Sequence, residues 1–404
     1  MGGIVAAVAF IGACSVQVPP TPVVVHRTTS TVEYWGSLFG EMKDTNYDTE
    51  FSPAPVTVPG RVAEVGTSNS TQYALLTDGR LFAWGLGTDG QLGNGSEQDS
   101  FGQPVQVRFP PGVRIASIPT DAMPYNTGLA VDTRGRAWGW GADGSGDLCL
   151  GNNRVHLTPV MVPLSGVTAL AGASNHALYD AGGTVYACGQ NVAGDLGSGS
   201  TRSSNRPVRV AGLSGSHVIK LVASFANSGA LLSDGEYFNW GYDGGGQLGD
   251  GHLRSSNVPV RVNLALPVTQ VAQGGSIWTN GQTLVMLSNG SLWAWGNDRF
   301  SQLGDRKTGI RSSPVRFRPP TGVTYAILAT GSATSYAIST TGKVYAWGVS
   351  FTGQVGDGLT RTARTPVLVA SGAVAISSTA NNVDISVPRV RSSPSGVRGR
   401  LAEP

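Results

Sequence analysis

The chain has 404 residues, of which 40% are hydrophobic and 13% are charged, and its formal net charge is +3. This length fits one large domain or two to three ordinary ones, and the apolar content is enough to form a core. The sparse, nearly balanced charge argues against a nucleic-acid-binding protein, which usually carries a dense basic patch or stripe. The 57 glycines have no Gly-X-Y period, so they indicate many tight turns and short strands rather than collagen.

The N-terminal sequence MGGIVAAVAFIGAC is a short apolar run that ends at Cys14. It is too short to cross a bilayer as a helix and is typical of a signal peptide. Its last four residues, IGAC, resemble a bacterial lipobox, in which the cysteine receives lipid. We therefore expect a lipoprotein-type signal peptide at 1–13, lipidation of Cys14, and a tether at 14–30. These features predict a bacterial envelope protein, lipid-anchored or secreted. The alternative is an uncleaved or wrongly assigned start.

A unit of about fifty residues recurs along the chain, marked by a Trp-Gly pair and, downstream, by Gln-Leu-Gly or a variant of it. The pairs are Trp35-Gly36, Trp84-Gly85, Trp140-Gly141, Trp240-Gly241, Trp295-Gly296 and Trp347-Gly348, and a seventh copy has Cys188-Gly189 in place of Trp-Gly. Seven copies at nearly even spacing indicate a repeat architecture.

Each unit has the same internal order of four short strands. Two apolar strands, such as 167–173 and 176–180, precede a glycine turn and the Trp-Gly strand, and a Gly/Asp/Asn-rich loop leads to a fourth strand with Pro-Val. Four such strands make an antiparallel meander that cannot bury both faces alone. Radial stacking buries those faces, so the sequence predicts an all-β, seven-bladed β-propeller of four-stranded antiparallel blades.

The two ends of the repeat region complement one another. The first Trp-Gly strand, STVEYWG, lacks the two strands that should precede it, and the segment 373–386 matches that missing pair. We therefore predict a propeller at 31–388 whose ring is closed by strands from both termini. The remaining segment, 389–404, is polar and basic and is expected to be a disordered tail.

The repeat resembles that of the regulator-of-chromosome-condensation family. The stretches TDGRLFAWGLGTDGQLGNG, SNGSLWAWGNDRFSQLGD and TTGKVYAWGVSFTGQVGDG carry the DGxVYAWG strand and the GQLG loop, and AGASNHAL carries the AGxxH turn. The resemblance covers about 31–386 and implies the propeller fold. Relatives include a nuclear exchange factor for a small GTPase, photoreceptor and ubiquitin-ligase modules, and secreted bacterial β-lactamase inhibitors, so function must be argued from sites. The secreted propellers are the nearer analogy, because this chain has no clear counterpart of the wedge-like hairpin of the exchange factor.

The sequence offers no recognisable catalytic, metal or cofactor site. The loop GYDGGGQLGDG leads to a strand rather than a helix, so its glycines serve a tight corner and not a phosphate. The five histidines have no metal-ligand spacing, and His176 is expected to be the structural histidine of its AGxxH turn. Of the three cysteines, Cys149 and Cys188 either pair in an oxidising compartment or remain small buried hydrophobes. The tryptophan of each Trp-Gly pair is expected in the core.

Alternate connections of a meander lie on the same face of the disc, so the turn after each first strand and the loop after each third strand should share a face. Non-repeating residues there are, in the turns, Met123, Tyr125, Phe225, Ile277 and Trp278, and in the loops, Phe39, Tyr242, Arg299, Phe300 and Phe351. Aromatic residues and arginine dominate binding hot spots. We therefore predict that nine of them, all but Ile277, bind a partner, with Trp278 the strongest candidate. The alternative is that they fold inward over the loop glycines.

These observations favour a non-enzymatic, monomeric propeller that binds another protein through one aromatic-rich face. A second hypothesis is a module that binds polysaccharide or the cell envelope, with the aromatics as sugar platforms. A third is a scaffold similar to a guanine-nucleotide-exchange factor, which requires that the N-terminus is not a signal peptide. A fourth is an enzyme, which would need a cluster of ionisable groups at the central channel. No cofactor and no nucleic-acid partner is expected.

Overall fold

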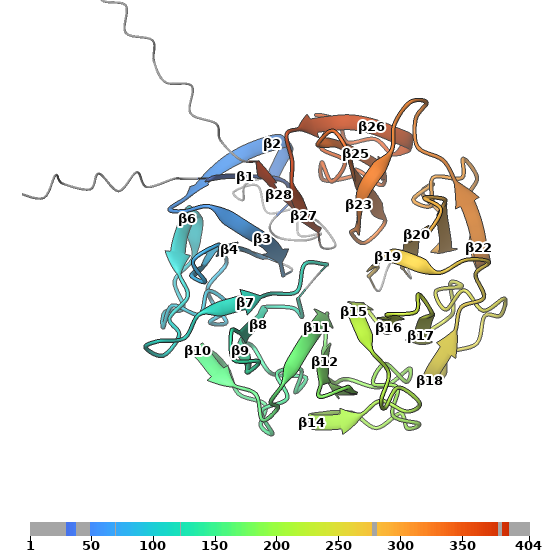
Figure 1. Cartoon of the computed structure of the whole chain (residues 1–404). Helices are drawn as coiled ribbons and strands as arrows, with labels where there is room; N and C mark the ends of the chain where they lie inside the picture. The colour runs from blue at the N-terminus through green and yellow to red at the C-terminus, as the bar shows by residue number, and fades with distance from the viewer. Residues whose placement is uncertain are drawn as a thin grey trace, which may run out of the picture.

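The computed structural model describes residues 30–37, 49–68, 70–121, 123–276, 281–378 and 382–387. Within these ranges the chain forms 28 β-strands and no helix. Figure 1 shows the strands arranged as sheets around a central axis, with one edge strand of each sheet innermost. The predicted all-β propeller with four-stranded antiparallel blades is confirmed.

The strands fall into seven four-stranded sheets, which we number as blades in chain order. Blade 1 holds β3 (Val62–Thr67), β4 (Thr71–Leu76), β5 (Leu81–Gly85) and β6 (Ser100–Gln106). Blade 2 holds β7 (Ile115–Ser117), β8 (Thr127–Asp132), β9 (Ala137–Gly141) and β10 (His156–Met161). Blade 3 holds β11 (Val167–Ala173), β12 (His176–Ala181), β13 (Thr184–Gly189) and β14 (Ser204–Arg209).

The second half of the ring repeats this pattern. Blade 4 holds β15 (Val218–Ser224), β16 (Asn227–Leu232), β17 (Tyr237–Gly241) and β18 (Ser256–Arg261). Blade 5 holds β19 (Val268–Gly274), β20 (Gln282–Leu287), β21 (Leu292–Asn297) and β22 (Ile310–Phe317). Blade 6 holds β23 (Tyr325–Thr330), β24 (Thr334–Ser339), β25 (Lys343–Gly348) and β26 (Ala363–Ser371).

The remaining sheet, which we call the closing blade, joins the two ends of the repeat region. Its order is β2-β1-β28-β27, with β1 (Ser30–Ser37) and β2 (Thr49–Val58) from the N-terminal side and β27 (Ala375–Ser378) and β28 (Asn382–Val387) from the C-terminal side. Strand β1 pairs antiparallel with β28, so that Glu33 lies opposite Ile385. The predicted closure by strands from both termini is therefore confirmed. The predicted signal peptide, tether, Cys14 and tail lie outside the described residues.

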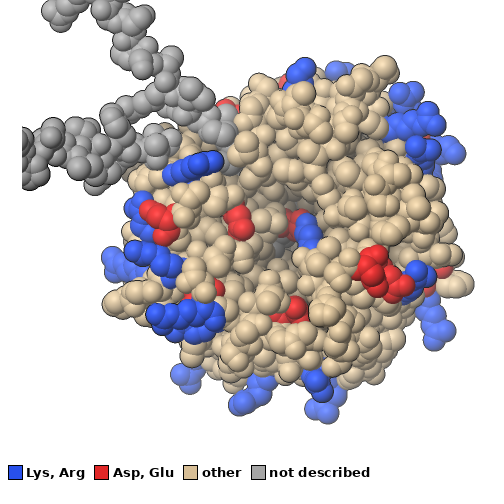
Figure 2. Space-filling model, viewed as in Figure 1, with Lys and Arg blue, Asp and Glu red and all other residues tan. Residues whose placement is uncertain are grey.

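The core lies between neighbouring blades rather than inside any one of them. The second strand of a blade, such as β4 or β16, is buried along its whole length, whereas outer strands such as β14 and β18 are partly exposed. Both faces of such a second strand are covered by adjacent blades, so even its polar first residues, as in TQYALL of β4 and NSGALL of β16, are buried. Figure 2 shows Lys and Arg mainly around the rim of the disc, and a hollow at its centre.

The Trp-Gly tryptophans join one blade to the preceding blade, and their burial confirms the prediction that they are core. In five cases the indole N–H donates at 2.9 Å to a backbone carbonyl in the preceding blade's glycine-rich loop: Trp140 to Gln91, Trp240 to Asp195, Trp295 to Gln247, Trp347 to Gln302, and Trp35 to Gln354. A glycine two residues after that carbonyl leaves room for the indole. We call this arrangement of indole, carbonyl and glycine the tryptophan latch.

The seam between blades 2 and 3 is held differently. Cys188 stands where the other blades have the Trp-Gly tryptophan, and Cys149 stands at the latch glycine position of blade 2. The two residues form a disulfide with a Cα–Cα distance of 5.5 Å. Of the two alternatives left open by the sequence, the structure therefore shows the bridged one.

Candidate functional site

One repeated hydrogen bond shapes the loop that follows the third strand in blades 2 to 6. In blade 4 the Asp243 carboxylate accepts the backbone N–H of Leu248 at 2.9 Å, and in blade 5 Asp298 accepts that of Leu303 at the same distance. The leucine is buried, so the loop is anchored at both ends. Between these anchors Gly246, with φ +78°, and Gln247 also serve the turn, whereas neighbouring residues such as Tyr242 and Phe300 differ between blades.

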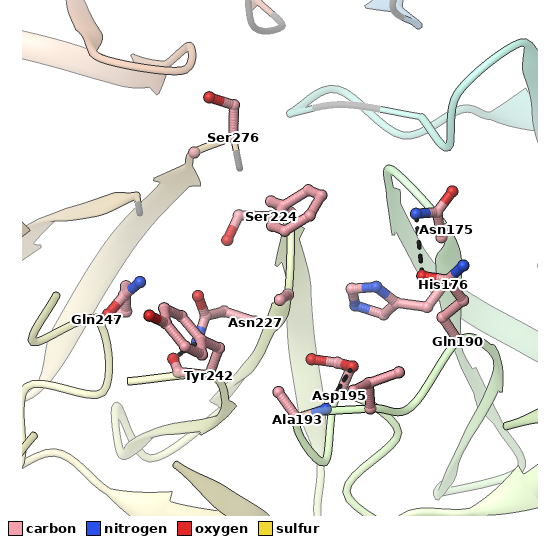
Figure 3. Close-up of a pocket in the computed structure, with 14 residues that line it drawn as sticks. Asn175, His176, Gln190, Ala193, Asp195, Ser224, Asn227, Tyr242, Gln247 and Ser276 are labelled. Atoms are coloured by element: carbon pink, nitrogen blue, oxygen red, sulfur yellow. Dashed lines mark hydrogen bonds between the residues drawn. The ribbon is translucent and has the colours of Figure 1, made fainter. Parts of the chain in front are cut away.

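A pocket of about 390 Å³ lies where the loops of blades 3, 4 and 5 meet (Figure 3). It is lined by the turns after β11 and β15, the loops after β13 and β17, and the residues that follow β19. First-strand turns and third-strand loops thus meet in one hollow, which confirms the prediction that they share a face. We call this hollow the inter-blade pocket.

The walls of the inter-blade pocket are largely apolar. Phe225 from blade 4 and Tyr242 from the loop after β17 are both half-buried there, and Val192 from blade 3 is 81% exposed. Asn227 donates a side-chain hydrogen bond to the Tyr242 backbone carbonyl, which fixes the start of that loop. Of the predicted partner-binding residues, the pocket therefore brings together Phe225 and Tyr242.

The polar lining consists largely of buried residues, which are His176, Asp195, Ser224, Asn227, Gln247 and Ser276. Figure 3 shows Asp195 and His176 on one side of the pocket and Tyr242 and Gln247 on the other. One Asp195 oxygen accepts the Ala193 N–H at 3.4 Å, and the other has no hydrogen-bond partner among the described residues. Burial raises the pKa of this carboxyl to about 7.

His176 has a structural role, as the sequence predicted. Its Nε2 lies 2.8 Å from Ser228 Oγ, and the serine hydroxyl donates to the Asp195 carbonyl at 2.8 Å. The side chain is 1% exposed, and burial lowers its pKa to about 4, so it is uncharged at neutral pH. The histidine therefore ties blade 3 to blade 4 and leaves the pocket without a positive charge of its own.

A second aromatic group lies on the loops of blades 5 and 6. The rings of Phe300 and Phe351 meet edge to face with centroids 5.6 Å apart, and the Arg299 guanidinium lies 5.6 Å from the Phe300 ring centroid. Phe351 is 62% exposed and Phe300 is half-buried. The structure therefore brings three more predicted residues together, at a seam next to the blades that carry the pocket.

The remaining predicted residues have three different outcomes. Met123 is 1% exposed and belongs to the core between blades 1 and 2, so its assignment to a partner-binding surface was wrong. Tyr125 is half-buried, and its backbone N–H donates to the Ser174 carbonyl of blade 3. Trp278, Phe39 and the neighbouring Ile277 lie outside the described residues. The error at Met123 arose because turn position alone does not reveal which way a side chain points.

Sequence reasoning missed Asp195. It stands where other repeats have glutamine, at Gln91, Gln247, Gln302 and Gln354. From the sequence, we interpreted this repeated position as part of the loop geometry. The glutamines do stabilise the loop, because Gln247 Oε1 accepts the Gly245 N–H at 2.7 Å. The replacement of a neutral amide by a carboxylate, which also occurs at Asp147 of blade 2, was the signal in the sequence.

The central channel also carries ionisable groups. Lys220 Nζ lies 3.0 Å from each carboxylate oxygen of Asp121 and donates to the Val271 carbonyl at 2.8 Å. Glu64 accepts the Ile118 N–H at 2.9 Å, and burial raises the pKa of its carboxyl. The lysine is fully engaged, so this cluster offers no free amine as a nucleophile or base.

Metal ligation and membrane crossing find no support in the described part of the chain. Among the described residues, no group of three or more His, Cys, Asp or Glu side chains is placed to hold a metal ion. Across the same ranges, no helix has the length and apolarity needed to cross a membrane.

Comparison with known proteins identifies the type of repeat. Residues 78–119, 182–230 and 234–278 match the model of the regulator of chromosome condensation (RCC1) repeat. These three segments therefore carry RCC1 repeats. The three matched RCC1 segments include the loops of blades 3 and 4 that line the inter-blade pocket.

Curated relatives share part of this RCC1 region. The chain is 29% identical over 288 residues to the ultraviolet-B receptor UVR8 of Arabidopsis thaliana, covering 69% of this chain and 63% of the receptor. It is 27% identical over 309 residues to the E3 ubiquitin-protein ligase HERC2 of Mus musculus, covering 74% of this chain and 6% of the ligase. The chain thus spans less than two thirds of either relative.

Two solved structures share the fold. Yeast RCC1 (Prp20), solved with Kap60 bound, superposes with a TM-score of 0.76 at 18% identity, covering 91% of each chain. Human WBSCR16 superposes with a TM-score of 0.75 at 17% identity, covering 89% of this chain and 98% of the other. At these identities the likeness concerns the fold alone.

Proposed function

We propose that this protein is a non-enzymatic binding propeller that holds a protein partner on the face carrying the inter-blade pocket and the Phe300–Phe351 pair. The observation that carries the proposal is the concave, mostly apolar pocket at a junction of three blades, with aromatic side chains that the repeat does not require. Pockets of this kind are the usual sites of recognition, and aromatics anchor interfaces.

Structural neighbours support a protein as the partner. Yeast RCC1 has been solved with Kap60 bound, and Prp20p from Saccharomyces cerevisiae has been described together with its binding to Gsp1p and histones. We carry over from these proteins only the general use of the propeller as a protein-binding platform.

The test is affinity capture with a triple variant, Phe225→Ala, Phe300→Ala and Phe351→Ala. A matched control replaces exposed apolar residues of the outer strands, Met161, Val258 and Leu368, with alanine. We expect a partner retained by the wild type and by the control to be lost from the triple variant, with both variants folded by circular dichroism. A partner bound equally by all three proteins would place the interface elsewhere.

We also propose that the protein works outside the cytoplasm and is anchored by lipid on Cys14. The lipobox-like IGAC sequence supports the anchor, and the Cys149–Cys188 disulfide supports an oxidising compartment. The test is incorporation of labelled lipid and globomycin-sensitive processing in a bacterial host, with Cys14→Ala as the control. Unchanged fractionation of Cys14→Ala would exclude the anchor.

A further inference from the structure

We propose that the inter-blade pocket receives a basic side chain of the partner, with its aliphatic stem along the apolar wall and its cationic head at Asp195. This inference rests on the proposed function and names the chemistry of the partner group. Its evidence is the aspartate at a position where four other repeats have glutamine, the surroundings of that carboxylate, and the apolar wall of the pocket.

The carboxylate at 195 is not required by the repeat. Glutamine at the same position makes the same local hydrogen bond, as Gln302 does by accepting the Phe300 N–H at 2.8 Å. In the tryptophan latch, the indole N–H of Trp240 donates to the backbone carbonyl of Asp195 and not to its side chain. The acidic side chain therefore adds a negative charge that the fold does not need.

Among the described residues that line the pocket, none supplies a counter-ion for the Asp195 carboxylate. The lining residues from blades 3, 4 and 5 include no Lys or Arg, and the ionisable ones besides Asp195 are His176 and Tyr242. His176 is uncharged at neutral pH and bonded to Ser228, as described above. A buried carboxylate without a partner is unfavourable, and an incoming cation relieves that cost by pairing with it.

The wall suits the rest of a basic side chain. Lys and Arg carry a long apolar stem that packs on hydrophobic surface while the charged head makes polar contacts. Val192 and Phe225 supply apolar surface, and the aromatic rings of Phe225 and Tyr242 attract cations through their faces. The volume of about 390 Å³ lies within the range of small-ligand pockets, about 300–1,000 Å³.

The other aspartate at this repeat position provides a control. Asp147 of blade 2 is also buried, and burial raises its pKa to about 8. It is not among the residues that line the inter-blade pocket, and its loop is bound to blade 3 by the disulfide. Asp147→Gln therefore makes the same chemical change at the same repeat position without altering the pocket.

The experiment measures binding of Nα-acetyl-arginine methylamide to the full chain by NMR titration, with the citrulline analogue as an uncharged ligand of similar shape. We expect the arginine derivative to bind at least about tenfold more tightly than the citrulline one. Asp195→Gln should abolish that preference, whereas Asp147→Gln should keep it. The lysine derivative tests whether the pocket distinguishes the two basic groups.

The pH dependence gives an independent readout. Because the cation pairs with the ionised carboxylate, affinity for the arginine derivative should rise from pH 6 to 8 and then level off in the wild type. In Asp195→Gln it should be flat. Equal binding of the two ligands, or no binding of either, would overturn the proposal. If arginine binding is confirmed but the aromatic triple variant keeps its partner, the pocket assignment stands and the proposed function fails.

Discussion

Cys188 of blade 3 is bonded to Cys149 of blade 2 at the point where five other seams carry a tryptophan above a glycine. The Asp147 carbonyl, which corresponds to the acceptor of the latch, lies 3.3 Å from the Cys188 sulfur, and a disulfide sulfur has no hydrogen to donate. Cys149 has φ +60°, close to the φ +61° of Gly93 at the corresponding latch position. The covalent bond has therefore replaced a hydrogen bond and an indole contact within an unchanged loop.

This equivalence predicts that the latch can be restored. Cys188→Ser alone should lower the free energy of unfolding by about 2–4 kcal/mol, the usual worth of a disulfide. The double variant Cys149→Gly with Cys188→Trp should recover most of that loss, because glycine accommodates both the indole and the positive φ. Thermal denaturation with and without dithiothreitol checks the prediction. A double variant no more stable than Cys188→Ser would show that the seam cannot hold an indole.

The latch glycine itself gives a second prediction. A Cβ on Gly249 would lie 2.6 Å from Trp295 Nε1, and the residue has φ +68°. Gly290 has a similar φ, +76°, but a Cβ there would meet nothing within 4 Å. Gly290→Ala should cost about 1 kcal/mol from backbone strain, and Gly249→Ala about 2–4 kcal/mol, because it also displaces the indole. Equal losses in chemical denaturation would mean that the indole moves aside freely.

The fold could be predicted from the sequence because the same four-strand unit recurs several times along the chain. The Trp-Gly pair, the turn glycine and the Pro-Val strand recur at matching positions. One divergent copy, such as the repeat with Cys188 in place of tryptophan, therefore does not hide the pattern. The incomplete first and last units also revealed how the ring closes.

The site was predictable only in part, because the residues that make it do not repeat. Strand order placed Phe225 and Tyr242 on the same face, but it could not show that Met123 turns into the core. Whether a loop side chain points outward depends on packing against a neighbouring blade. Asp195 was overlooked for a related reason, since its charge matters only where three blades enclose it.

The contact between Phe300 and Phe351 leads to a third prediction. Edge-to-face pairs contribute about 0.5–1.5 kcal/mol beyond the area they bury. Phe351 is 62% exposed, so a double-mutant cycle to alanine should give a coupling at the low end of that range. The double variant should therefore melt close to the wild type while weakening partner capture. A large loss of stability would instead identify the pair as a packing element.

Buried loop aspartates predict that the propeller loses stability as the pH rises. Burial raises the pKa of Asp298 from 3.8 to about 8. An unfolded chain therefore ionises this group near pH 4 and the folded chain only near pH 8, so the associated stability is lost progressively across that interval. Asp298→Asn removes the ionisation and keeps an oxygen for the Leu303 N–H, as Asn191 does for Leu196 in blade 3 at 2.8 Å.

The difference in stability between Asp298→Asn and the wild type should consequently grow from pH 5 to 8 and stay level at pH 9, reaching roughly 1–3 kcal/mol. Asp234→Asn is the control, because that carboxylate is exposed and accepts the Glu236 N–H from a surface turn. Unfolding followed in urea at each pH provides the measurement. If Asp298→Asn gave the same difference at pH 5 and pH 9, the carboxyl would not titrate in this interval, and a second acceptor or donor would have to hold it in one state.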